Sequence, residues 1–208
     1  MDFSDVIAQR TSEHAFVSPC EKIKESDFLD IVDCTKTTPS GYNAQPWHFL
    51  LIREDDRLES IQKLAYNQKH ICEAGNLVIV LGDKEFGKNE CERICEEWKT
   101  YRRFTEQQVS ALRASLQKGR EEWKKREMML RNVSLACMTF MLGAENNGWS
   151  SCPMMGFRQL DLKRYLELPE DVLPVMMIAL GKRDKDKSLD RMPRKKAEEI
   201  SSFETYKK

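Results

Sequence analysis

Apolar residues recur along this chain with the two periods that distinguish helices from strands. Helical spacing occupies 3–10, 25–36, 55–65 and 158–167. Short apolar runs that predict buried strands occupy 47–52, 76–82 and 173–181. Because helices and strands mix without a regular βαβ repeat, the pattern predicts an α+β fold. A length of 208 residues suits a single domain spanning 1–208.

Two long segments depart from this amphipathic pattern. Residues 85–128 are highly charged and helical with interspersed aromatic residues, which predicts a helical excursion from the domain. Residues 133–144 are apolar on every side, which predicts a helix buried in the core. Gly148 is expected to end that helix, and SCPMMGF at 151–157 is expected to be a tight loop.

The C-terminal arm, from about 182 to 208, has its own composition. Residues 182–196 contain eight basic and three acidic residues. The last twelve residues, AEEISSFETYKK, are expected to pair as an edge strand or to wrap a partner.

The charge balance and the cysteines narrow the class of protein. Lysine plus arginine and aspartate plus glutamate both number 34, so no net field attracts nucleic acid or an anionic membrane. No apolar run approaches the roughly 18 residues of a membrane span, and the N-terminus lacks a secretory pattern. Seven scattered cysteines without a CxxC pair favour a reducing, cytoplasmic location. We expect Cys91 and Cys95 to be small buried residues and predict no metal site.

The segment TPSGYNAQPWHF at 38–49 carries more polar chemistry than a turn requires. Pro39 fixes φ, Ser40 forms local hydrogen bonds and Gly41 accepts a positive φ. The amides of Asn43 and Gln45 exceed that need. They indicate a binding site.

Common catalytic signatures are missing from the sequence, which contains no GxGxxG, Walker, HExxH or GxSxG motif. However, RTSEH at 10–14, PSGYNAQPWHF at 39–49, SCPMMGF at 151–157 and GK…PRKKAEEI at 181–200 follow one another in a familiar order. In that order they resemble the nitroreductase family of FMN-dependent flavoproteins. The resemblance implies a central, mostly antiparallel sheet flanked by helices, in an intertwined homodimer.

FMN carries a dianionic phosphate, and bidentate guanidinium contacts suit such a group. The resemblance assigns Arg10 and Ser12 to the phosphate, with Arg194 and Lys195 as opposing cations from the tail. The alternatives are a surface helix charge for Arg10 and a solvated tail for the other two cations.

Position 14 departs from the family pattern. The family commonly has Arg or Lys there, whereas this chain has His14. An imidazole is mostly neutral at pH 7, so the constant positive charge that stabilises reduced flavin would be lost. If His14 takes that place, we expect a lower, pH-dependent reduction potential and weaker FMN binding. The alternative is a solvent-facing side chain.

The resemblance also assigns residues to the flavin ring and to the ribityl chain. Pro39, Ser40, Asn43 and Gln45 would serve the ribityl hydroxyls and the flavin edge, on a loop that crosses to the partner subunit. Trp47 is expected to anchor the core or the interface.

Residues from two further segments are expected near the flavin ring. Asn67 would bond the ring or cap a turn, with Lys69 and His70 as neighbours. Met155 and Gly156 would approach flavin N5 through their main chain, unless they form an ordinary turn.

The implied activity is ping-pong hydride transfer from NAD(P)H to an oxidised acceptor such as a nitroaromatic or a quinone, with no catalytic side chain. Trp98, Tyr101 and Phe104 would line the substrate pocket or pack helix against helix. A flavin carrier or sensor without turnover is the main alternative, and a helical interaction module is the other. The sequence leaves open the acceptor and the choice between NADH and NADPH.

Overall fold

A four-stranded antiparallel sheet forms the centre of the computed structural model, which describes residues 2–206. Its strand order is β1-β2-β4-β3, and every neighbouring pair is antiparallel. The strands are β1 Trp47–Ile52, β2 Asn76–Asp83, β3 Ser150–Met154 and β4 Val172–Gly181. The expected α+β class with a mostly antiparallel sheet is confirmed.

The central strand β2 places side chains in two cores, one on each face of the sheet. Leu77 and Ile79 belong to one buried cluster, and Val78 and Val80 belong to the other. All four side chains are fully buried, because strand residues alternate between the faces and both faces are covered.

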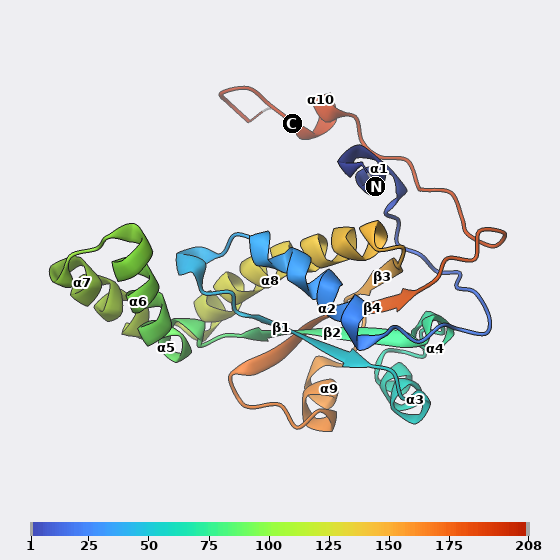
Figure 1. The fold of residues 1–208 in the computed structure, drawn as a ribbon, viewed down its shortest axis with the longest axis horizontal. Helices are drawn as coiled ribbons and strands as arrows, with labels where there is room; N and C mark the ends of the chain where they lie inside the picture. Colours follow the sequence, from blue (N-terminus) through green and yellow to red (C-terminus); the bar gives the residue numbers. More distant parts are fainter. Residues whose placement is uncertain (1, 207–208) are drawn as a thin grey trace.

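Helices cover the two faces of the sheet in separate groups (Figure 1). One face carries α2 Glu25–Cys34 and α8 Glu122–Asn146. The other face carries α3 Asp55–Leu64, α4 His70–Ala74 and α9 Gln159–Tyr165. The result is a three-layer arrangement with the sheet in the middle.

The helical excursion lies at one end of the molecule (Figure 1). It consists of α5 Phe86–Asn89, α6 Cys91–Arg102 and α7 Glu106–Gln117. Cys91 and Cys95 are buried in its small core, as expected for small apolar side chains. The boundary at 128 was wrong: α8 already begins at Glu122, because its charged first turns continue without a break into the apolar segment.

Two other expectations are corrected. Residues 150–154 form strand β3, not a tight loop, because Pro153 is tolerated on an edge strand that pairs only with β4. The helix over 133–144 is not buried on every side. Leu135 is 50% exposed and Met138 is 43% exposed, so α8 presents an apolar outer face.

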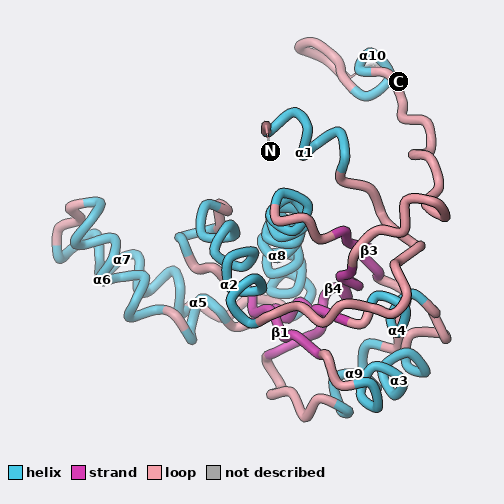
Figure 2. The backbone as a smooth tube through the Cα atoms, turned by 45° about the vertical axis from the view of Figure 1, so that its right-hand side comes forward, coloured by secondary structure: helices cyan, strands magenta, loops and turns pink. Residues whose placement is uncertain are grey.

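The two terminal segments lie together, away from the sheet (Figure 2). Helix α1 Phe3–Gln9 opens the chain, and the arm carries the short helix α10 Ala197–Ile200. Residues 197–206, the described part of the last twelve, contain no strand, so the edge-strand expectation was wrong for them. Across residues 2–206, no helix combines the length and the apolar character needed to span a bilayer.

Candidate functional site

The structure places the predicted site residues in two separate regions of the folded molecule (Figure 1). Arg10, Ser12 and His14 lie beside β3 and the C-terminal arm. The loop at 39–45 lies against α6 at the opposite end, where Asn43 and Tyr42 bond to that helix. A single chain therefore holds two separate groups of candidate residues, which we call the first and the second half-site.

The first half-site contains a cavity of about 570 Å³ between residues 11–15 and the C-terminal arm. Ser12, His14 and Arg194 line it together. Ser12 is held by a parallel bridge to Ser151 on β3, which fixes the N-terminal segment to the sheet. Lys195 is exposed and does not line this cavity.

Positive charge accumulates around Arg10, which caps the C-terminus of α1. Burial lowers the pKa of Arg10, and the nearby Arg191, Arg194 and Arg183 lower it further, while Glu145 acts in the opposite direction. Among residues 2–206, no side-chain hydrogen bond holds the Arg10 guanidinium. Clustered guanidiniums repel one another, so an anion placed among them would be stabilised.

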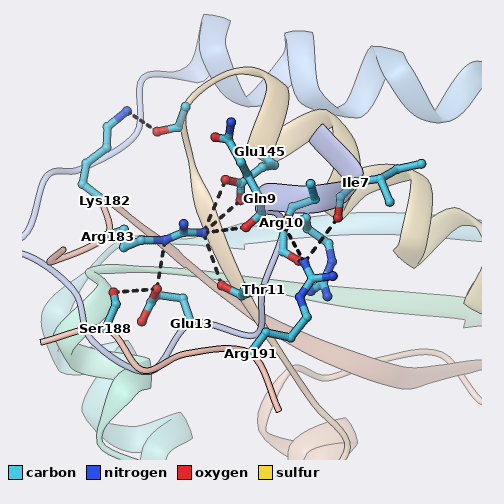
Figure 3. Close-up of polar contacts among 12 residues, drawn as sticks. Ile7, Gln9, Arg10, Thr11, Glu13, Glu145, Lys182, Arg183, Ser188 and Arg191 are labelled. Carbon is cyan, nitrogen blue, oxygen red and sulfur yellow. Dashed lines mark hydrogen bonds and ion pairs between the residues drawn. The ribbon is translucent and has the colours of Figure 1, made fainter. Parts of the chain in front are cut away.

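A buried ion network holds the backbone of this half-site (Figure 3). Arg183 Nε lies 3.0 Å from Glu13 Oε2, and its Nη2 donates to Glu145 Oε1 at 3.3 Å. The same Nη2 donates to the Gln9 carbonyl at 3.1 Å. Glu13 and Glu145 are almost fully buried, so they depend on this partner for compensation.

Arg191 has a structural contact that the sequence did not reveal. Its Nη2 donates to the carbonyls of Ala8 at 2.8 Å and Arg10 at 2.6 Å, near the C-terminal end of α1 (Figure 3). A cation is favourable at that end of a helix. The contact ties the arm to α1. Three arm cations, Lys187, Arg191 and Arg194, line the cavity, and Arg194 Nη1 also donates to the Met192 carbonyl.

Three side chains meet at the inner end of the first half-site. His14 Nε2 lies 3.7 Å from Cys152 Sγ, and the rings of His14 and His70 meet edge to face at 5.0 Å. Burial and the neighbouring His14 lower the pKa of His70, while burial raises the pKa of Cys152 to about 11. The three residues are far apart in sequence, so no motif indicated this cluster.

Two turns flank this cluster. Asn67 is exposed and takes a left-handed φ of 60°, which an asparagine tolerates. Next to it, Gln68 Nε2 donates to the Gly156 carbonyl at 2.7 Å. Met155 is 78% exposed beside it. The turn with Asn67 and the turn with Met155 and Gly156 therefore lie together, with Met155 free to contact a ligand.

The second half-site is a strained and internally bonded loop. Tyr42, Asn43 and Gln45 all have φ between 50° and 61°, which costs free energy for residues other than glycine. Ser40 Oγ accepts the Gln45 N–H at 3.0 Å, and Trp98 Nε1 donates to the Tyr42 carbonyl at 3.1 Å. Strain of this kind is often retained where a loop must present groups to a ligand.

Helix α6 and this loop enclose a cavity of about 640 Å³. Pro39, Ser40 and Asn43 line it together with Trp98 and Tyr101. Phe104 does not line it and instead packs edge to face on Trp98, with ring centroids 4.9 Å apart. Gln45 lies on the far side of the loop, where it lines a smaller cavity with Trp47.

The fold places the chain among solved proteins of the nitroreductase fold. YdfN of Bacillus subtilis superposes with a TM-score of 0.89 at 28% identity, covering 97% of this chain and 98% of that one. The chain belongs to the nitroreductase family, because the model for that family matches residues 7–182.

Two relatives and one further structure complete the comparison. MhqN of Bacillus subtilis is 29% identical over 208 residues, covering 99% of this chain and 98% of MhqN. The oxygen-insensitive NAD(P)H nitroreductase of Salmonella typhimurium is 25% identical over 174 residues, 76% of this chain and 77% of that enzyme. A protein from Exiguobacterium sibiricum, crystallised in complex with FMN, shares the fold with a TM-score of 0.84 at 22% identity, covering 98% of this chain and 97% of that one.

The buried Glu145 should make stability depend on pH in an unusual direction. Burial raises its pKa, and Arg183 and Arg10 only partly offset that rise. The contribution of Glu145 to stability is therefore complete below the unfolded value of 4.5 and is lost as pH rises through the raised folded pKa. We expect Glu145→Gln, which resembles the protonated form, to gain stability relative to wild type as pH rises from 4.5 to 7.

Urea unfolding at several pH values measures this difference. Glu198→Gln, at an exposed position on α10, is the control. The difference in stability between this variant and wild type should not change with pH. If Glu145→Gln instead loses stability relative to wild type as pH rises, attraction to Arg183 outweighs the cost of burial.

Proposed function

We propose that this protein is an FMN-dependent oxidoreductase that uses NAD(P)H to reduce a small oxidised acceptor. The observation that carries the proposal is the group of guanidiniums around Arg10, beside a cavity lined by Ser12 and Arg194. A dianionic phosphate would relieve the repulsion among these cations. The FMN held by the Exiguobacterium sibiricum relative supports the same assignment.

The residues present fit FMN at each of its parts. Arg10 and Ser12 would hold the phosphate, and Arg194 would add a cation from the arm, whereas Lys195 lies outside the cavity. The turns at Asn67 and at Met155–Gly156 lie side by side, so backbone and amide groups there would meet the ring edge. His14 faces the same cavity as Ser12 and would stand near the pyrimidine edge.

The two half-sites support a homodimer in which each flavin uses both chains. The loop at 39–45 lies against α6, whereas Arg10 ends α1, and these two helices lie apart in the fold (Figure 1). Within one chain the loop and Ser12 therefore line two separate cavities. A second copy that covers the apolar outer face of α8 would bring the loop to the partner's cationic cavity. The arm also has exposed apolar side chains, such as Phe203 at 89%, that a partner would cover.

Bound FMN would supply hydride transfer at N5, first from NAD(P)H and then to an acceptor such as a nitroaromatic or a quinone, in a ping-pong sequence. The protein would bind and orient the reactants, and no side chain is required as a nucleophile. The cavity between α6 and the loop at 39–45 would receive the acceptor next to Trp98 and Tyr101.

Steady-state oxidation of NADH and NADPH with p-benzoquinone and nitrofurazone tests the proposal. Full-length protein loaded with FMN should give parallel double-reciprocal lines with at least one donor. The alternative, a flavin carrier, is favoured by His14 in place of a constant cation. It predicts bound flavin without turnover for either donor or either acceptor.

The charge at position 14 should set the flavin potential. His14→Lys places a constant positive charge where we assign the pyrimidine edge, and that charge stabilises the additional negative charge of the reduced cofactor. We expect the midpoint potential to rise by about 30 mV or more, which is ~1.4 kcal/mol for a two-electron couple. Spectroelectrochemical titration measures it, with the exposed His48→Lys as the control. Equal potentials in His14→Lys and wild type would remove His14 from the flavin environment.

Tyr101 should influence the choice of acceptor without influencing the cofactor. Its side chain is 80% exposed at the cavity wall, so Tyr101→Ala removes contact area for an acceptor and leaves the core intact. We expect kcat/KM for a bulky quinone to fall about 10-fold, the scale of one lost apolar contact, with unchanged FMN affinity. A fall in FMN affinity of similar size would instead place Tyr101 at the cofactor.

A further inference from the structure

We propose that Arg102 makes this protein selective for aromatic acceptors that carry a carboxylate. The inference rests on the proposed function, and it names the class of acceptor for the cavity of about 640 Å³ between α6 and the loop at 39–45. Among the described residues, Glu97 and Arg102 are the charged groups that line this cavity. The contacts that each of them already makes decide which charge remains for a ligand.

The carboxylate of Glu97 is already engaged by the protein. Its Oε1 accepts from Arg93 Nη1 at 2.7 Å, and its Oε2 accepts from Asn43 Nδ2 at 2.9 Å. Arg93 Nη2 also donates to the Ala44 carbonyl at 3.0 Å, so this network fastens α6 to the loop. A cationic ligand would therefore have to compete with Arg93 for Glu97.

The guanidinium of Arg102, by contrast, is available to a ligand. It is exposed in the last turn of α6, and within residues 2–206 no hydrogen bond or ion pair engages its side chain. A guanidinium presents its N–H donors in a planar fork that matches the two oxygens of a carboxylate. The ordinary alternative is a cation that only complements the negative end of the helix dipole, a role that Arg103 can also fill.

Aromatic rings supply other walls of the cavity. Tyr42 and Trp98 line it with their ring centroids 6.3 Å apart. Trp98 is fixed in place, because its Nε1 donates to the Tyr42 carbonyl at 3.1 Å and Phe104 packs against its ring. Tyr101, next to Arg102, is 80% exposed. A flat aromatic ligand would gain contact with these rings while its carboxylate meets Arg102.

The size and the position of the cavity suit a reactant beside the cofactor. Its volume lies within the range of small-molecule sites, about 300–1,000 Å³. Pro39, Ser40 and Asn43 line it, and we assign the same loop to the edge of the partner's flavin. The ligand would therefore lie against the cofactor and not replace it. A carboxylate held at one end of the ring would fix the orientation of the reducible group at the other end.

Two acceptors of nearly equal size test this selectivity, the anionic 4-nitrobenzoate and the neutral 4-nitrobenzamide. In either one, the nitro group would gain the hydride and a proton and lose one oxygen as water, which leaves a nitroso product and NAD(P)⁺. We expect Arg102→Gln to lower kcat/KM for 4-nitrobenzoate by about 10-fold, the low end for a hydrogen bond between charged groups, because the site is exposed. The value for 4-nitrobenzamide should change far less. Arg102→Lys should keep part of the preference, since it retains the charge and loses the planar fork.

Arg103→Gln is the matched control. Arg103 follows Arg102 in the chain, is exposed and does not line the cavity, so the variant removes the same charge from the end of α6. An equal effect of the two variants would mean that the general field, and not a contact, attracts the carboxylate, and it would overturn the proposal. An equal loss for both acceptors would overturn it as well. So would a loss seen only with NADPH and not with NADH, because Arg102 would then serve the 2′-phosphate of the donor.

Calorimetry separates this inference from the proposed function. Binding of 4-nitrobenzoate to full-length protein with FMN, but without a donor, requires no turnover. We expect its dissociation constant to rise about 10-fold in Arg102→Gln and to stay at the wild-type value in Arg103→Gln. If 4-nitrobenzamide is reduced but Arg102→Gln binds 4-nitrobenzoate as wild type does, the enzyme assignment stands and the selectivity is wrong. If the binding difference appears but neither donor is oxidised, the carboxylate site stands and the proposed function is wrong.

Discussion

Mixing two inactive variants of this chain should restore about a quarter of wild-type turnover, if each site takes its phosphate end from one subunit and its loop from the other. One variant is Arg10→Ala, which damages the cationic half-site. The other is Asn43→Asp/Gln45→Glu, which keeps the size of both side chains and turns amide donors into acceptors. Random pairing makes half of the dimers mixed, and each mixed dimer has one intact site.

The experiment uses FMN at a concentration that saturates wild type but not the variants, after subunits are exchanged by co-expression. Circular dichroism and size-exclusion chromatography establish that both variants fold and assemble. Co-expression of two Arg10→Ala chains, each with a different affinity tag, is the control and should stay inactive. Mixed dimers without activity would mean that each site is built within one chain.

Arg10→Ala alone should weaken FMN binding by roughly 10- to 150-fold, equivalent to about 1.5–3 kcal/mol for a hydrogen bond to a charged group. The guanidinium of Arg10 is half-buried among other cations and lacks a side-chain hydrogen bond among the described residues, which leaves its donors for the phosphate. Arg10→Lys should lie between wild type and Arg10→Ala, because an ammonium keeps the charge but loses the bidentate geometry.

Flavin fluorescence during titration measures the dissociation constant in each variant. Arg164→Ala is the matched control, since Arg164 is an exposed arginine on α9 that pairs with Asp161 far from the cavity. Affinity for FMN that is the same in Arg10→Ala as in Arg164→Ala would remove Arg10 from the phosphate site.

Most of the fold could be predicted from periodicity, because apolar spacing reports which face each element buries. The strands at 47–52, 76–82 and 173–181 appear within a few residues of their expected bounds. Strand β3 was missed because Pro153 and Gly156 are turn signals, whereas an edge strand has no need of the missing N–H. The start of α8 was missed because its first turns are charged and carry no apolar face toward the sheet.

The candidate site was only partly accessible from sequence. The loop at 39–45 and Arg10 follow from local composition and family order. The pairing of Arg183 with Glu13 and the approach of His14 to Cys152 depend on contacts between residues more than 130 positions apart. No spacing rule links such residues, because strand pairing and the path of the arm bring them together.

The separation of the two half-sites has the same origin. From the sequence alone, the loop and the phosphate residues are assigned to the same cofactor. In space, β1 runs from the loop at one end of the sheet to the other end, so within one chain the two groups stay apart (Figure 1).

The absorbance spectrum of FMN-loaded protein, recorded anaerobically before and after NADH or NADPH is added, tests the central claim most directly. The proposed function predicts the oxidised flavin band in the blue region and its loss within seconds of adding at least one donor. A flavin band that persists with both donors would contradict the enzyme assignment and favour a carrier. Failure to retain FMN would contradict the cofactor site itself.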